Sequence, residues 1–110
     1  MDNLLPQQPW ELDILEMSTS DLAKYEIVDL RDDGEQLNIL RSLLRLDIHK
    51  MPLATFDEEN PPLDKQKRYL FVSQEGAHSA RLVSSLRHKG YDNVYSLVGG
   101  VEAVRRKFIA

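Results

Sequence analysis

Cysteine is missing from this 110-residue chain. Its absence excludes disulfide bonds, thiolate metal ligands and a thiol nucleophile, and it suits the reducing cytosol. Long apolar runs are missing too, since no stretch approaches the roughly 20 residues that a membrane-spanning helix needs. Residues 1–10 are polar and contain prolines, without the basic-then-apolar pattern of a secretory signal. We therefore expect a cytoplasmic protein with no membrane contact.

Positive charge is in deficit, with 14 Lys and Arg residues against 18 Asp and Glu residues and a formal net charge of -4. Such a balance gives no general attraction to nucleic acid. The three histidines show no metal-binding spacing, and no dinucleotide or nucleophile-elbow pattern surrounds Gly99-Gly100 or Ser73. We expect no metal, no cofactor and no nucleic-acid partner.

What the chain does contain is enough for one globular domain, with 42% hydrophobic residues. We expect a lead-in or linker at 1–10 and the domain at 11–110. Apolar periodicity predicts strands at 12–15, 26–30, 46–48, 69–73 and 93–97, and helices at 18–24, 34–43, 78–89 and 101–108. This alternation predicts an α/β fold with a mostly parallel sheet and helices on both faces.

Individual residues mark the ends and the buried faces of these elements. Ser18 with Asp21 has the pattern of a helix N-terminal cap, and Gly90 stands where a left-handed C-terminal cap is needed. Two helix faces are predicted to be buried: Ser79, Leu82, Val83 and Leu86 on one helix, and Val101, Val104 and Phe108 on another. Residues 53–66 read as a loop. Arg81, Arg87, His88 and Lys89 are expected on an exposed side, either as a solvated face or facing an acidic partner.

Ligands of parallel sheets bind at the carboxyl ends of the strands. Those ends are predicted near Asp29 and Arg31, at the 73–79 segment, and near Gly99 and Gly100. The segment comprises Ser73, Gln74, Glu75, Gly76, Ala77, His78 and Ser79. Its amides can point inward at the start of a helix and hold an anion or stabilise a thiolate. The alternative is a plain strand-to-helix turn in which Ser73 or Ser79 caps the helix.

Four segments, in order, resemble the rhodanese-like family over about residues 12–108. Residues 25–31 are similar to the strand that ends in Asp-Val-Arg, and 49–53 to the His-Ile-Pro segment. Residues 71–79 fall where the family has Cys-Arg-x-Gly-x-Arg-Ser, and 97–103 resemble Leu-x-Gly-Gly-Ile-x-Ala. The resemblance implies a three-layer α/β/α fold around a mostly parallel sheet of about five strands. It also implies a site in the 73–79 loop, supported by Asp29, Arg31, Gly99 and Gly100.

The chain departs from the family at the residue that carries its chemistry. Family members hold a sulfane sulfur as a persulfide on the loop cysteine, and here that position is Ser73. His78 replaces an arginine, and Val104 replaces a tryptophan. An oxygen cannot form a persulfide, and Ser73 has no neighbouring base in the sequence. We therefore expect a non-catalytic binding or regulatory module.

Two other functions remain open at this stage. The chain is a sulfurtransferase if Ser73 replaces a natural cysteine, and the 73–79 loop could instead bind a small anion such as phosphate. The Pro52-Leu53 pair is similar to rhodanese domains fused behind enzymes that adenylate sulfur-carrier proteins. The resemblance therefore implies a protein partner of that kind, either a sulfur carrier or an adenylating enzyme.

Overall fold

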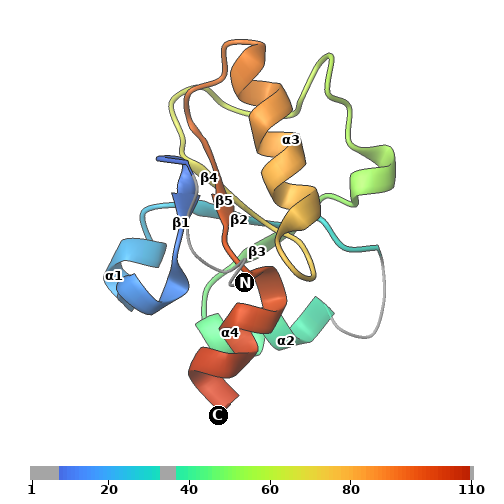
Figure 1. Ribbon diagram of the computed structural model, residues 1–110. Helices are drawn as coiled ribbons and strands as arrows, with labels where there is room; N and C mark the ends of the chain where they lie inside the picture. The colour runs from blue at the N-terminus through green and yellow to red at the C-terminus, as the bar shows by residue number, and fades with distance from the viewer. Residues whose placement is uncertain (1–7, 33–36, 110) are drawn as a thin grey trace.

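The computed structural model describes residues 8–32 and 37–109. Its strands form one sheet in the order β1-β5-β4-β2-β3, and every pairing among them is parallel. The strands are β1 (Glu11–Leu12), β2 (Glu26–Asp29), β3 (Ile48–Lys50), β4 (Tyr69–Val72) and β5 (Val94–Leu97). The helices are α1 (Thr19–Leu22), α2 (Leu37–Leu44), α3 (Ala77–His88) and α4 (Gly100–Ile109), with short 3₁₀ helices η1 (Ile14–Glu16) and η2 (Leu53–Thr55). The predicted α/β class is confirmed (Figure 1).

The sheet is covered on both faces, because successive side chains of a strand point to opposite sides. On β4, Leu70 and Val72 join a core cluster with residues of η1, α1, α2 and α4. Tyr69 and Phe71 join a second cluster with residues of α3. The layers are therefore α3 on one face and α1, α2 and α4 on the other, with the sheet between them.

Several predicted boundaries are wrong at the edges of the sheet. The strand expected at 12–15 is only Glu11–Leu12, since the Asp13 side chain accepts a hydrogen bond from the Leu15 amide at 2.9 Å and starts η1. The strand expected at 46–48 lies at Ile48–Lys50, where it pairs with β2. The start of the helix expected at 34–43 falls partly outside the described residues.

Two side chains also differ from their predicted places. Phe108 is 41% exposed, because the last turn of α4 passes the core that holds Val101 and Val104. Arg87 is half-buried instead of exposed, and its guanidinium donates to the Val94 carbonyl at 2.7 and 2.9 Å. The four residues predicted to share a face of α3 are all buried, as expected. Among the described residues, no helix combines the length and the apolar character needed to cross a bilayer.

The predicted caps are confirmed. Ser18 accepts a hydrogen bond from the Asp21 amide at 3.0 Å, and the Asp21 carboxylate accepts one from the Ser18 amide at 2.8 Å. The backbone hydrogen bond from Ser18, followed by the one from its side chain, lowers the pKa of the Asp21 carboxyl. Gly90 follows α3 with φ +99°, the left-handed conformation expected of a C-terminal cap.

The amino end of α4 docks directly on the segment that follows β4. The amides of Val101 and Glu102 donate to the carbonyls of Ser73 and Gln74 at 2.9 and 3.1 Å. Gly100 makes this approach possible: its φ is +58°, and a Cβ atom there would lie 2.1 Å from the Ser73 carbonyl oxygen. Helix α4 therefore sets the path of the 73–79 loop.

This close approach predicts unequal costs for two glycine substitutions. Gly90→Ala should cost about 1–2 kcal/mol of unfolding free energy, the strain of a left-handed residue, because no atom lies within 4 Å of its new Cβ. Gly100→Ala adds a backbone overlap and should cost at least about 3 kcal/mol. Urea unfolding of both variants measures the difference. Equal costs would show that the Gly100 contact is not a constraint on the fold.

Candidate functional site

The side chain of Ser73 lies at the centre of the loop between β4 and α3. Its Oγ accepts hydrogen bonds from the amides of Gly76 at 3.2 Å and Ser79 at 3.1 Å. Gly76 allows the turn with φ +97°, and a Cβ there would lie 2.7 Å from the Gly99 nitrogen. The oxygen of Ser73 thus occupies the position toward which two loop amides converge, and the side chain is buried, with the residue 3% exposed.

A chain of buried hydroxyls continues from Ser73 toward β5. The Ser73 hydroxyl donates to Ser79 Oγ at 3.2 Å, and Ser79 Oγ donates to the Gly76 carbonyl at 3.1 Å. Ser96 Oγ lies 2.7 Å from Ser79 Oγ. Because Ser79 has one hydroxyl proton, which goes to Gly76, Ser96 is the donor in this last contact. Sequence reasoning missed Ser96; the only signal was a serine at a core-facing position of a strand.

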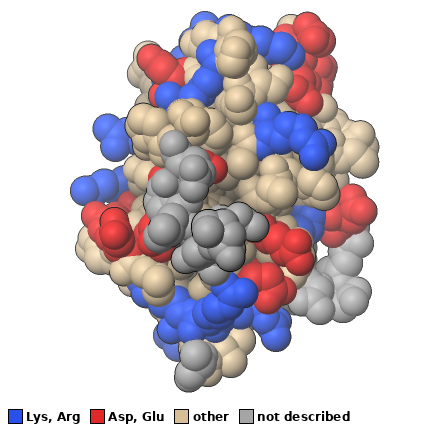
Figure 2. All heavy atoms as spheres, in the orientation of Figure 1, with Lys and Arg blue, Asp and Glu red and all other residues tan. Residues whose placement is uncertain are grey.

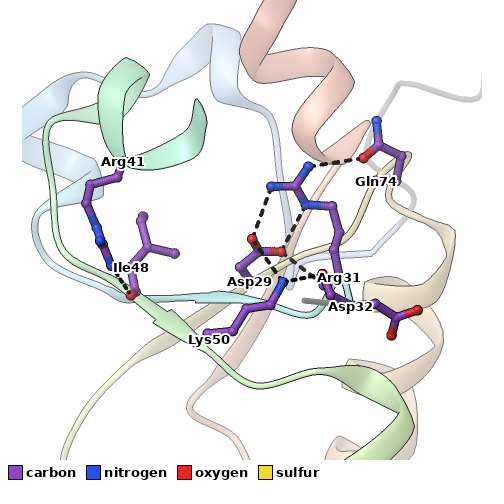
Figure 3. Close-up of polar contacts among 7 residues, drawn as sticks. All are labelled: Asp29, Arg31, Asp32, Arg41, Ile48, Lys50 and Gln74. Atoms are coloured by element: carbon purple, nitrogen blue, oxygen red, sulfur yellow. Dashed lines mark hydrogen bonds and ion pairs between the residues drawn. The ribbon is translucent and has the colours of Figure 1, made fainter. Parts of the chain in front are cut away.

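Asp29 anchors a second polar chain at the carboxyl end of β2 (Figure 3). The carboxylate is fully buried and accepts from Arg31 Nε and Nη2, both at 3.1 Å. Lys50 Nζ lies 3.6 Å from the same carboxylate. Two cations therefore face one buried anion, which compensates the cost of burying that charge.

The polar network around Asp29 reaches the candidate loop through Arg31. Its Nη1 donates to Gln74 Oε1 at 3.3 Å, and Gln74 Nε2 donates to Glu102 Oε2 at 2.7 Å. The side-chain amide of Gln74 thus connects the residue that follows β2 to α4. Figure 3 shows Gln74 beside the Arg31 guanidinium. Lys50 and Glu102, which belong to this network, were not among the predicted site residues, because only tertiary packing brings them here.

The remaining loop side chains point outward. Glu75, Ala77 and His78 are exposed. Among the described residues, His78 makes no hydrogen bond with Ser73, whose side-chain partners are Ser79 and two amides. The hydroxyl therefore lacks a base that would remove its proton.

A cavity of about 490 Å³ opens beside the loop, between its outer side and α4. Its walls include Glu11, Glu75, Glu102 and Arg106, but Ser73 does not line it. No group of three or more potential metal-ligating side chains occurs within residues 8–32 and 37–109. Within the part of the chain that the structure describes, the site offers amide donors and a buried hydroxyl, with no base in contact with that hydroxyl and no group of metal ligands.

Comparison with known proteins agrees with this architecture. The family model of the rhodanese-like domain matches residues 13–107. A rhodanese-related protein from Thermoplasma volcanium superposes with a TM-score of 0.64 at 19% identity, over 88% of this chain and 91% of that one. A rhodanese homolog from the extremely thermophilic bacterium Thermus thermophilus gives 0.62 at 21% identity, over 84% and 98%.

One further solved structure is much longer than this chain. An NAD-dependent persulfide reductase from A. fulgidus matches with a TM-score of 0.59 at 20% identity, over 84% of this chain but 15% of the reductase. Identities at this level report the fold alone. A search of curated proteins returned no match.

The converging amides predict the behaviour of a thiol placed at the centre of the loop. In Ser73→Cys, two amide donors and the start of α3 should stabilise the thiolate and lower the pKa of Cys below the usual value of about 8.5. The pH at which the alkylation rate is half-maximal measures that pKa. Ser42→Cys, an exposed serine near the end of α2, is the control and should titrate at about 8.5 or above. An equal or higher midpoint for Ser73→Cys would mean that burial outweighs the amides.

Proposed function

This chain belongs to the rhodanese-like domain family, and we propose that it acts as a binding or regulatory module that does not itself carry sulfur. The observation that carries the proposal is the place of the Ser73 oxygen. It lies where the two loop amides converge, at the position that the family fills with a sulfur-carrying cysteine. A serine oxygen there cannot form a persulfide, and none of its described contacts is a base that would activate it for attack.

The serine does have a structural role, which supports the proposal. Ser79 is the third residue of α3, so its amide has no partner within the helix. Ser73 Oγ supplies that partner from outside the helix, while Gly76, at the cap position itself, has no side chain to do so. In this chain Ser73 therefore caps α3, and this role requires neither exposure nor reactivity of its hydroxyl.

The proposed partner is a protein, either a sulfur carrier or the adenylating enzyme that activates one, attached to or associated with this domain. The Pro52-Leu53 pair after β3 supports this assignment through its likeness to domains fused behind such enzymes. A cytoplasmic location belongs to the same proposal, as does the absence of nucleic-acid and membrane partners. The net charge of -4 agrees with it.

The loop geometry also favours a second candidate function. The two converging amides are the arrangement that a thiolate or persulfide needs, so a chain with cysteine at position 73 would be a sulfurtransferase. A cysteine codon at that position in the natural gene would replace the first proposal by this one. Binding of a free anion in the loop has less support, since Ser73 Oγ already occupies two of the donors.

Sulfur transfer from thiosulfate to cyanide tests the proposed function. The chain itself should form no thiocyanate above the uncatalysed rate. Ser73→Cys should gain measurable transfer, and adding His78→Arg should raise it further, because a permanent cation attracts the anionic donor. Ser42→Cys provides a thiol outside the loop and should stay inactive. Thiocyanate formation by the serine protein would contradict the proposal.

The capping role has its own test. Ser73→Ala leaves two buried amides without their acceptor and should cost about 2 kcal/mol of unfolding free energy. Ser42→Ala, which removes a hydroxyl from an exposed helix position, should change stability by less than about 0.5 kcal/mol. Chemical denaturation compares the two. If Ser73→Ala is as stable as Ser42→Ala, the serine is not a structural cap.

A further inference from the structure

A cavity of about 360 Å³ lies between α3 and the segment that follows β3. Leu53 and Glu58 come from that segment, and His78, Arg81, Leu82 and Ser85 come from α3. The helix residues recur at three- and four-residue intervals, so they share one face of α3. Ser73 does not line this cavity. Its volume is within the range of small-molecule sites in proteins.

The charges around the cavity are unevenly paired. Glu58 accepts a hydrogen bond from Ser85 Oγ at 2.8 Å, and Lys89 Nζ lies 4.0 Å from the same oxygen. Arg81 is exposed and makes no hydrogen bond or ion pair with any residue of the described ranges, 8–32 and 37–109. Glu58 is therefore partly compensated by Lys89, which also lies 3.4 Å from Glu59, whereas Arg81 on the other wall is available.

The same cavity has an apolar side. Leu82 is 3% exposed and belongs to the core cluster of the α3 face, and the half-buried Leu53 packs against that cluster. An apolar ligand body gains contact area here, but a hydrated inorganic ion gains none. Glu58, although paired, opposes an anion with two charges more strongly than an anion with one.

We propose that this cavity binds a small organic monocarboxylate. The guanidinium of Arg81 pairs with the carboxylate, a geometry that arginine favours because its planar fork offers two parallel donors. Leu53 and Leu82 contact the apolar body. The start of α3, one turn from Arg81, adds positive potential. This inference goes beyond the proposed function, since it uses neither Ser73 nor a protein partner.

A titration of the 15N-labelled chain with 3-phenylpropionate tests the proposal. The compound combines one carboxylate with an apolar ring. Backbone amide signals of residues 53–58 and 78–85 should shift and saturate. Arg81→Gln should weaken binding about tenfold, the loss of one charge-assisted pair at a partly exposed site. Arg105→Gln removes an arginine from α4, which does not line the cavity, and should leave the affinity unchanged.

Two uncharged or inorganic probes complete the experiment. 3-Phenyl-1-propanol keeps the ring without the charge and should bind at least about tenfold more weakly. Inorganic phosphate lacks the apolar body and should not shift the same amides. The proposal is overturned if 3-phenylpropionate does not saturate, if Arg81→Gln binds as well as the parent chain, or if phosphate shifts these amides equally. Thiocyanate assays report separately on Ser73, so failure of one proposal is distinguishable from failure of the other.

Discussion

The contact between the amino end of α4 and the carbonyls of Ser73 and Gln74 is the constraint on which the rest of the site depends. The first amides of a helix have no partner within it, and here two of them bind the carbonyls that follow β4. With those carbonyls turned toward α4, the amides of Gly76 and Ser79 face Ser73 Oγ. The approach requires a residue without a Cβ atom at position 100. One backbone contact therefore determines both the path of the loop and the direction of its donors.

Side chains also connect the 73–79 loop to α4. The buried carboxylate of Asp29 fixes Arg31, Arg31 binds Gln74, and Gln74 binds Glu102 in the first turn of α4. The loop is thus attached to α4 through backbone and through side chains, and to β2 through Arg31. No buried side-chain nitrogen or oxygen lacks a partner within the described part of the chain. The network is restricted at its Asp29 end, since breaking that pairing would leave a buried charge without a partner, whereas the hydrogen bonds of Gln74 are exposed to solvent.

With serine at position 73, where family members have cysteine, the two loop amides still have a hydrogen-bond acceptor. A sulfur at position 73 would receive the two amides as a thiolate, whereas the Ser73 oxygen receives them as a neutral hydroxyl and passes its own proton to Ser79. The donors are satisfied in both cases. In the view of Figure 2, Lys and Arg side chains lie at the lower end, over α4, and also at the upper end, with Asp and Glu side chains between and beside them. These charges are open to solvent, whereas the side chain of Ser73 is buried.

The amino-acid sequence alone determined the parallel α/β fold, because strand and helix periods alternate and each carries its own apolar pattern. It also located the 73–79 loop, through Gly76 and the strand before it, and the caps at Ser18 and Gly90. Tertiary structure alone decided that Ser96, Lys50 and Glu102 join the site. Each of these three residues lies on a different element. The sequence around each one does not indicate which side chains of other elements it contacts in the fold. Tertiary packing likewise decided the bounds of β3, which follow from its pairing with β2, and the 41% exposure of Phe108, which its helical period predicts to be buried.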